Sequence, residues 1–347
     1  MESSDPFTEL IPSFPDELGL ECLTRLPFPV HRFASRVSRR WRALMESQEF
    51  YHHRKKKGYT HKLACLVQAL SREESLISNS PKRNESPSFG LTVFDLADKS
   101  WQRLDPVPKY PSGLPLFCQV ASCEGKLVVM GGLDPISYDP VTDLFVYDFA
   151  TSRWRRGESM PTKRSFFAVG SHSGRVYVAG GHDENKNALD SAWVYDLRRD
   201  EWTELTRMSQ GRDECVGRVV GGEFWVVSGY VTEHQGAFEP SVEVYEIETS
   251  RWRRVEGAWE GGKCPRGCVY GGKERLLSWA ELDAAVGVGT CGVELGTRSL
   301  VTGSAYQGGT HGFYMVELKE GQIGKLERVS VPEEFSGCVR SGCCVEV

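Results

Sequence analysis

The chain has 347 residues, enough for one large domain and one small one. Hydrophobic residues make up 40%, 36 residues are glycine, and the formal net charge at pH 7 is −5. The charge is uneven: His31–Lys62 contains ten Lys and Arg and two Glu, a net +8, which leaves −13 for the rest. A basic segment on an acidic body favours a local acidic partner and argues against a nucleic-acid-binding domain.

Three further features restrict the class of protein. No run reaches the roughly 18 apolar residues that span a membrane, so no membrane partner is expected. Met1–Glu9 lacks the basic start and apolar core of a secretory signal. The eleven cysteines have no regular spacing, which argues against a disulfide scaffold. We therefore expect a protein of the reducing cytoplasm or nucleus.

The first fifty residues have a helical pattern. Pro15 followed by Asp16 and Glu17 predicts a helix start, and the element closes at Leu26-Pro27. A second helical stretch is expected from Val30 to Met45, with one apolar stripe formed by Phe33, Val37, Trp41 and Leu44. Two or three helices of this size have too little core to be stable alone, so the segment should pack on something else.

The spacing of apolar residues in this segment resembles an F-box, the helical motif that docks a receptor onto the Skp adaptor of a cullin–RING ubiquitin ligase. The resemblance covers about forty residues. It departs at Phe14, where Leu is usual, and at Arg39-Arg40. It implies adaptor-binding roles for Pro15, Leu18, Leu23, Leu26, Pro27, Val37 and Trp41. The alternative is an unrelated amphipathic cap on the following domain.

A basic run, His52–Lys57, follows the helical segment. It fits a nuclear-import patch, a surface for an acidic partner, or a solvated linker. The sequence therefore predicts a helical F-box domain over 1–51, a basic linker over 52–60 and a second domain over 61–347.

A repeat of about fifty residues occupies that second domain. An aromatic residue precedes tryptophan by seven positions in four places, and successive tryptophans are 53, 48 and 50 residues apart. The four pairs are Phe94–Trp101, Tyr147–Trp154, Tyr195–Trp202 and Tyr245–Trp252. Three of them follow an apolar run that ends in a glycine turn, at 127–132, 176–181 and 224–229.

The apolar runs predict strands buried on both faces, and the tryptophans predict large contacts between neighbouring units. This order and period are typical of a kelch repeat, so we expect a mainly β fold, a kelch β-propeller preceded by the small F-box. The alternative is a β-sandwich with coincidental spacing.

The number of blades is less clearly marked than the repeat. Blades two to four are expected at 113–156, 163–206 and 211–255, and 78–88 is expected to be an insertion within the first blade. After Trp259 the repeat degrades. Strands are possible at 275–279, 299–303 and 313–318, and the final run 342–347 could complete blade one and close the ring. Six blades are favoured, and five are possible.

Several patterns resemble chemical motifs but have simpler interpretations. Gly287–Gly292 has the dinucleotide-binding spacing without a helical pattern after it, so a turn is predicted. Cys264 and Cys268 lack the second ligand pair that a zinc site needs. We therefore predict no catalytic residues, no cofactor and no metal.

The candidate target-binding residues lie in the loops of blades three and four. Arg164 and Arg212 each precede the turn of their blade by sixteen residues, and the loops beyond carry His182, Asp183 and Glu233. A ring of such groups suits an acidic or polar protein surface. Alternatively, the arginines hold the loops by hydrogen bonds to neighbouring groups.

Together the two resemblances cover nearly the whole chain, which is similar to plant F-box/kelch-repeat ubiquitin-ligase receptors. Gly113–Cys118, Arg164–Phe167, Ala179–Glu184 and Arg212–Cys215 resemble the KISS ME DEADLY-type subgroup. That subgroup implies turnover of phenylalanine ammonia-lyase or type-B response regulators. Other possible functions are a scaffold that sequesters a partner without ubiquitin transfer and a propeller enzyme.

Overall fold

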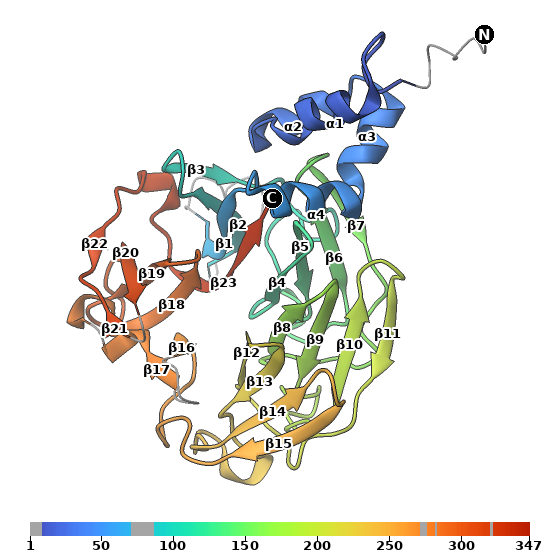
Figure 1. Cartoon of the computed structure of the whole chain (residues 1–347). Coiled ribbons are helices and arrows are strands. Elements are labelled where there is room, and N and C mark those ends of the chain that lie inside the picture. The colour runs from blue at the N-terminus through green and yellow to red at the C-terminus, as the bar shows by residue number, and fades with distance from the viewer. Residues whose placement is uncertain (1–8, 71–86, 271–275, 282, 320–321) are drawn as a thin grey trace.

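The computed structural model describes residues 9–70, 87–270, 276–281, 283–319 and 322–347. These residues form four N-terminal helices followed by β-sheets arranged around a central axis (Figure 1). The fold is therefore mainly β with a helical N-terminus, as the sequence predicts. Most of the predicted insertion 78–88 lies outside the described residues.

The first four sheets have four antiparallel strands each. Blade one contains β1 (Lys62–Ala69), β2 (Phe89–Asp95), β3 (Ser100–Arg103) and β23 (Val339–Glu346). Blade two contains β4 (Gln119–Cys123), β5 (Lys126–Met130), β6 (Leu144–Asp148) and β7 (Arg153–Arg156). Blade three contains β8 (Ala168–His172), β9 (Arg175–Ala179), β10 (Ala192–Asp196) and β11 (Glu201–Glu204). Blade four contains β12 (Val216–Val220), β13 (Glu223–Val227), β14 (Val242–Glu246) and β15 (Arg251–Val255).

The remaining strands form one larger and one smaller sheet. Blade five contains β18 (Val288–Glu294), β19 (Arg298–Ser304), β20 (Gly312–Lys319), β21 (Gln322–Ile323) and β22 (Glu327–Arg328). Between blades four and five lies a two-stranded sheet, β16 (Cys268–Tyr270) and β17 (Leu276–Ser278). The described residues thus form a five-blade arrangement, the second of the two expected counts, and the additional sheet has only two strands.

The constant spacing from aromatic residue to tryptophan comes from strand pairing. In each of the first four blades the aromatic residue lies directly opposite the tryptophan, as in Tyr147 opposite Trp154. The indole N–H then donates to a carbonyl of the preceding blade: Trp154 to Asp105 at 2.9 Å, for example, and Trp202 to Glu158 at 2.9 Å. The predicted contact between neighbouring blades is therefore made by both the ring and its N–H.

The ring closes through the last strand of the chain. β23 pairs with β1 over Lys62–Gln68, and His61 and Val347 exchange backbone hydrogen bonds of 2.8 and 2.9 Å. The prediction that the final run completes blade one is confirmed. Closure pairs the inner edge of β1 that would otherwise be exposed.

The helical unit (residues 9–60) contains α1 (Asp16–Thr24), α2 (Phe28–Ala34), α3 (Arg39–Glu46) and α4 (Gln48–Lys57). The expectation of one helix over Val30–Met45 is wrong, because α2 ends at Ala34 and α3 begins at Arg39. The Ser38 hydroxyl accepts a hydrogen bond from the backbone N–H of Trp41 at 3.1 Å and so caps α3. The predicted basic linker 52–60 is helical over 52–57, the last part of α4, and Gly58 with φ +72° caps the end of that helix.

The helical unit packs on the propeller at the turns that follow β4 and β6. Phe28 meets Phe149 with 5.7 Å between ring centroids, and the Tyr51 ring lies so close to Gly125 that any Cβ there would clash. His52 is 3.2 Å from Glu124, and Lys55 is 2.9 Å from Glu346. Figure 1 shows α4 beside the end of β23. The expectation that the helices need a surface to pack on agrees with this contact.

Candidate functional site

The residues predicted to bind an adaptor fall into two groups. Leu23 is buried in the core of the helical unit, and Leu26 and Trp41 pack against that core. The Trp41 indole N–H also donates to the carbonyl of Leu10 at 2.5 Å. By contrast, the side chains that a partner could contact are exposed: Pro15, Leu18, Pro27 and Val37.

Two of these exposed residues, Leu18 and Val37, are among five exposed large apolar side chains of the helical unit. Leu18 is 52% exposed and Val37 is 65% exposed, although both are apolar. The adaptor-side surface, as we call it, consists of Phe14, Leu18, Val30, Phe33 and Val37. Five exposed apolar side chains on one small helical unit are the candidates for contact with a partner protein.

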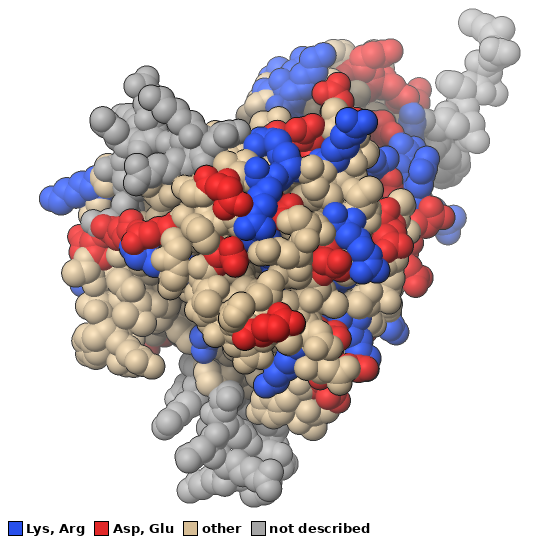
Figure 2. Space-filling model, turned by 90° about the horizontal axis from the view of Figure 1, so that it is seen from below, with Lys and Arg blue, Asp and Glu red and all other residues tan. Residues whose placement is uncertain are grey.

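The basic segment finds acidic partners within the chain. His52 and Lys55 contact Glu124 and Glu346 of the propeller, as described above. Arg54 is buried, and its guanidinium donates to the carbonyls of Thr24, Leu26 and Tyr59 at 2.6–2.8 Å. Figure 2 shows basic and acidic side chains interspersed on the face seen from below. Part of the predicted acidic partner of this segment is therefore the propeller itself.

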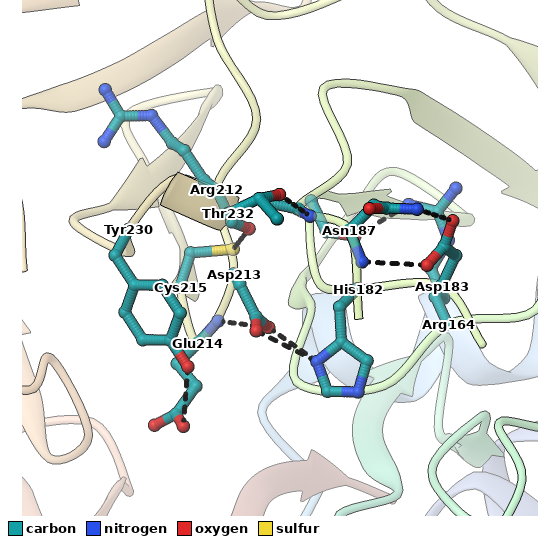
Figure 3. A network of polar contacts seen from close by, with 12 residues as sticks. Arg164, His182, Asp183, Asn187, Arg212, Asp213, Glu214, Cys215, Tyr230 and Thr232 are labelled. Carbon is teal, nitrogen blue, oxygen red and sulfur yellow. Dashed lines mark hydrogen bonds and ion pairs between the residues drawn. The ribbon is translucent and has the colours of Figure 1, made fainter. Parts of the chain in front are cut away.

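Arg164 and Arg212 are both 0% exposed, so they cannot contact a target directly. Arg164 donates to the carbonyls of Gly180 and Ser191, and Arg212 donates in the same way to Ser228 and Ser241 (Figure 3 shows both arginines). Each also donates to a hydroxyl, that of Ser191 or Ser241. The structure thus corrects the target-contact assignment in favour of the alternative: these arginines hold both ends of the loops after β9 and β13.

The other three candidates lie on those loops. His182 is buried, and its Nδ1 lies 2.9 Å from a carboxylate oxygen of Asp213 in the next blade (Figure 3). Asp183 organises its own loop by accepting hydrogen bonds from the backbone N–H groups of Asn185 and Asn187. Glu233 is exposed. Of the five candidates, Glu233 is therefore the residue most accessible to a partner.

The inner strands β23, β4, β8, β12 and β18 surround a central channel with a cavity of about 330 Å³. At one end of the channel, Phe117, Phe166 and Glu214 occupy equivalent positions, each two residues before an inner strand. All three have positive φ, +58°, +56° and +50°. We call this end the mouth, and Arg266 and Arg340 also line it.

The mouth residues make contacts across the blades. The rings of Phe117 and Phe166 are 4.2 Å apart, and the Phe166 ring is 5.4 Å from that of His182. The Arg340 guanidinium lies 5.7 Å from the Phe117 ring. Arg266 pairs with Glu214 at 3.2 Å. The mouth therefore combines an aromatic surface with cationic groups.

The mouth residues are not among the candidate site residues predicted from the sequence. A signal was present, because Phe117, Phe166 and Glu214 each precede the second residue of their glycine turn by fifteen positions, at Gly132, Gly181 and Gly229. These turns need glycine: a Cβ on Gly181 would lie 2.3 Å from the carbonyl oxygen of Ser165. The turn after β9 and the loop before β8 therefore lie in close contact, and this contact helps to fix the position of the mouth residue Phe166.

The glycine and cysteine patterns that resemble cofactor and metal motifs lie in strands, turns and the protein core. Gly287–Gly292 runs into β18, which is followed by β19 and not by a helix. All eleven cysteines are within the described ranges, and none forms a disulfide. Burial raises the pKa of the Cys118 thiol to about 12, so this thiol remains protonated at neutral pH. Within the described residues no group of His, Cys, Asp and Glu could hold a metal, and no helix is long and apolar enough to cross a membrane.

Comparison with known proteins matches both parts of the chain. The F-box domain model matches residues 11–53, and the KLHDC2/KLHL20/DRC7 Kelch-repeats domain model matches residues 78–269. The protein is thus an F-box protein with a kelch propeller. An F-box implies binding of a Skp-type adaptor, and a kelch domain implies a protein substrate.

Individual relatives identify the family of this chain more narrowly than the two domain models do. An F-box/kelch-repeat protein of Arabidopsis thaliana is 34% identical over 98% of this chain and all of its own length. Two others from the same plant are 42% and 40% identical over 76% and 70% of this chain, covering 69% and 68% of their own. The chain belongs to the plant F-box/kelch-repeat family, whose members are typically non-catalytic adaptors. Membership of the KISS ME DEADLY-type subgroup stays a prediction.

Proposed function

We propose that this protein is the substrate receptor of an SCF-type ubiquitin ligase. The observation that supports this role is the distribution of exposed apolar side chains among the described residues. Five are on the helical unit, and the other four are on the propeller: Ile136, Tyr138, Val288 and Tyr306. Two separate surfaces are what a protein needs to hold an adaptor and a target at once.

The two surfaces lie at opposite ends of the inner strands. The helical unit contacts the turn after β4, at Glu124 and Gly125, whereas Phe117 and the mouth lie before β4 begins. Ile136 and Tyr138 are in the loop between β5 and β6, on the mouth side, and Tyr306 is in the corresponding loop between β19 and β20. An adaptor on the helices therefore leaves the mouth side open to a target.

In this role the receptor supplies proximity and no catalytic group. Holding the target in the same complex as the ubiquitin-charged enzyme raises the effective concentration of its lysines. The contacts between the helical unit and the propeller fix the orientation of the two surfaces. We propose the cytoplasm or nucleus as the place of action.

The adaptor surface can be tested with two kinds of variant. Val37→Glu places a charge on an exposed side chain, so adaptor co-purification should be lost while the melting temperature stays close to that of the wild type. Trp41→Ala should reduce both, because Trp41 packs in the core of the helical unit. Full adaptor binding by Val37→Glu, or by Leu18→Glu, would contradict the proposal and favour a scaffold that sequesters its partner.

The identity of the target needs a separate experiment. Proximity labelling with the proteasome blocked should enrich the target together with the adaptor. The resemblance stated above makes phenylalanine ammonia-lyase and type-B response regulators the first proteins to examine. Labelled partners whose abundance does not change when the receptor is removed would indicate a scaffold.

A further inference from the structure

We propose that the mouth binds a linear segment of the target in which a carboxylate stands next to an aromatic or large aliphatic side chain. The apolar side chain would lie on Phe117 and Phe166, and the carboxylate would pair with Arg340. This inference rests on the proposed receptor function and specifies the kind of sequence that the receptor recognises.

The aromatic part of the proposal follows from the backbone. Phe117 and Phe166 have positive φ, which is uncommon for a bulky residue and is energetically unfavourable. That conformation keeps both rings at the channel instead of in the core between blades. They remain half-buried, 4.2 Å apart, with no described side chain covering them fully. A paired aromatic surface of this kind suits an apolar side chain from a partner.

The arginines at the mouth and in the channel differ in whether a carboxylate neutralises their charge. Arg266 is paired with Glu214, and Arg218, deeper in the channel, lies 3.7 Å from Glu294. Arg340 is exposed and rests against the rings of Phe89 and Phe117, and no described carboxylate lies within ion-pair distance of it. Its charge is therefore available to a carboxylate next to the aromatic surface.

The Arg218 guanidinium adds a polar group deeper in the channel, although its charge is compensated by Glu294. It lines the channel, its Nη2 donates to the carbonyl of Cys268, and its buried Nε has no hydrogen-bond partner in the described structure. A buried donor without a partner is unfavourable.

The test uses the full chain purified with its adaptor and a phage library of random heptapeptides. The selected peptides should carry an Asp or Glu next to Phe, Tyr, Trp or Leu. In fluorescence anisotropy, the selected peptide should bind at least about tenfold more tightly than versions with the acid changed to its amide or the apolar residue changed to Ser. A tenfold change corresponds to about 1.4 kcal/mol.

Variants at the mouth should then remove each preference separately. Arg340→Gln should abolish the preference for the acid over its amide. Phe117→Asn and Phe166→Asn should abolish the preference for the apolar residue, since Asn tolerates positive φ and should leave the fold intact. Arg251→Gln, an exposed arginine on the outer strand β15, is the matched control and should change neither.

Two results would overturn the inference. One is a selection that enriches no acidic–apolar pattern, and the other is a preference that survives unchanged in the mouth variants. If either occurs while the adaptor still co-purifies, the receptor function stands and only the mouth assignment fails. Loss of adaptor binding in the wild-type chain, with peptide binding intact, would instead overturn the receptor function.

Discussion

At the scale of single residues, the arginines that precede the inner strands illustrate how loops are positioned. Arg212 bonds to two backbone carbonyls and the Ser241 hydroxyl, and it lies 3.6 Å from the buried Glu243. Burial lowers the pKa of Arg212, although Glu243 opposes that effect. Because its charge is compensated within the blade, Arg212 serves to hold the loop.

The change Arg212→Ala should therefore lower the free energy of unfolding by about 3–5 kcal/mol, because it leaves Glu243 buried without its cation. Urea unfolding of the propeller measures this loss. The exposed Arg207, which pairs with Asp190 on the surface, is the control, and Arg207→Ala should cost less than about 1 kcal/mol. An Arg212→Ala protein that is as stable as wild type but no longer binds target would restore the recognition role.

The repeat tryptophans lead to a second prediction at this scale. The Trp202 ring packs against that of Tyr195 with 5.1 Å between centroids, and its indole N–H donates to the Glu158 carbonyl at 2.9 Å, so Trp202→Ala removes both packing and a hydrogen bond between blades. We expect a loss of about 3 kcal/mol, visible as a lower melting temperature. Trp202→Phe keeps a ring and should cost about 1 kcal/mol. An unchanged melting temperature in Trp202→Ala would contradict the role given to the repeat.

The residue scale also shows what could be predicted from the sequence. The offset between Tyr195 and Trp202 indicates a strand pair, because pairing within a short hairpin depends on local spacing. Whether Arg164 is exposed depends on carbonyls sixteen and twenty-seven residues away, which no local pattern shows. The mouth residues were missed for a related reason: Phe166, with positive φ, is in a loop that lies against the glycine turn after β9, a contact between segments distant in the sequence.

At the scale of elements, the helical unit is stabilised by helix caps and a buried polar side chain in addition to its apolar residues. Ser38 and Ser47 cap α3 and α4, and Ser38 lies inside the expected Val30–Met45 helix, at the point where it is divided. Arg54 satisfies carbonyls at the end of α1 and after it. The sequence indicated one apolar stripe but not the break between α2 and α3, because Phe33 and Trp41 are spaced nearly as they would be on one continuous helix.

Buried His31 gives the helical unit a pH dependence. Burial, together with the nearby Arg54, lowers its pKa from 6.5 to about 4, and its Nε2–H donates to the Leu26 carbonyl at 3.1 Å. Between pH 6.5 and 4 the unfolded chain binds a proton here that the folded chain does not. The free energy of unfolding should therefore fall as pH falls through this range, by about 3 kcal/mol in total from this group.

The His31 effect can be separated from other titrations by comparing unfolding curves at several pH values. His31→Gln should be less stable at pH 7 but should lose less stability on acidification than the wild type. His234→Gln, at an exposed position, should retain the wild-type slope. Equal pH slopes for His31→Gln and wild type would show that His31 is protonated in the folded state.

At the scale of the whole molecule, one strand joins the ring to the helical unit. β23 closes blade one, and its Glu346 contacts both Lys55 and the Thr60 hydroxyl, at 2.9 and 2.6 Å. Lys55 and Thr60 help to lower the pKa of this carboxyl, against the opposing effect of burial. The same strand carries Arg340 at the mouth end. The helical unit, the ring and the mouth are therefore physically connected through nine C-terminal residues, 339–347.

This connection predicts the effect of Val345→Asp, which places a carboxylate opposite Leu63 at a fully buried position in β23. An unpaired buried charge should destabilise blade one by several kcal/mol and separate β23 from β1. The melting temperature should fall, and the freed edge of β1 should make the protein self-associate in light scattering. Adaptor binding should weaken as well, because Glu346 no longer holds α4.

Ser341→Asp, at a channel-facing position of the same strand, should leave the ring closed and tests whether any added charge has this effect. If Val345→Asp melts within about 2 °C of wild type and stays monomeric, the ring does not depend on β23 for closure.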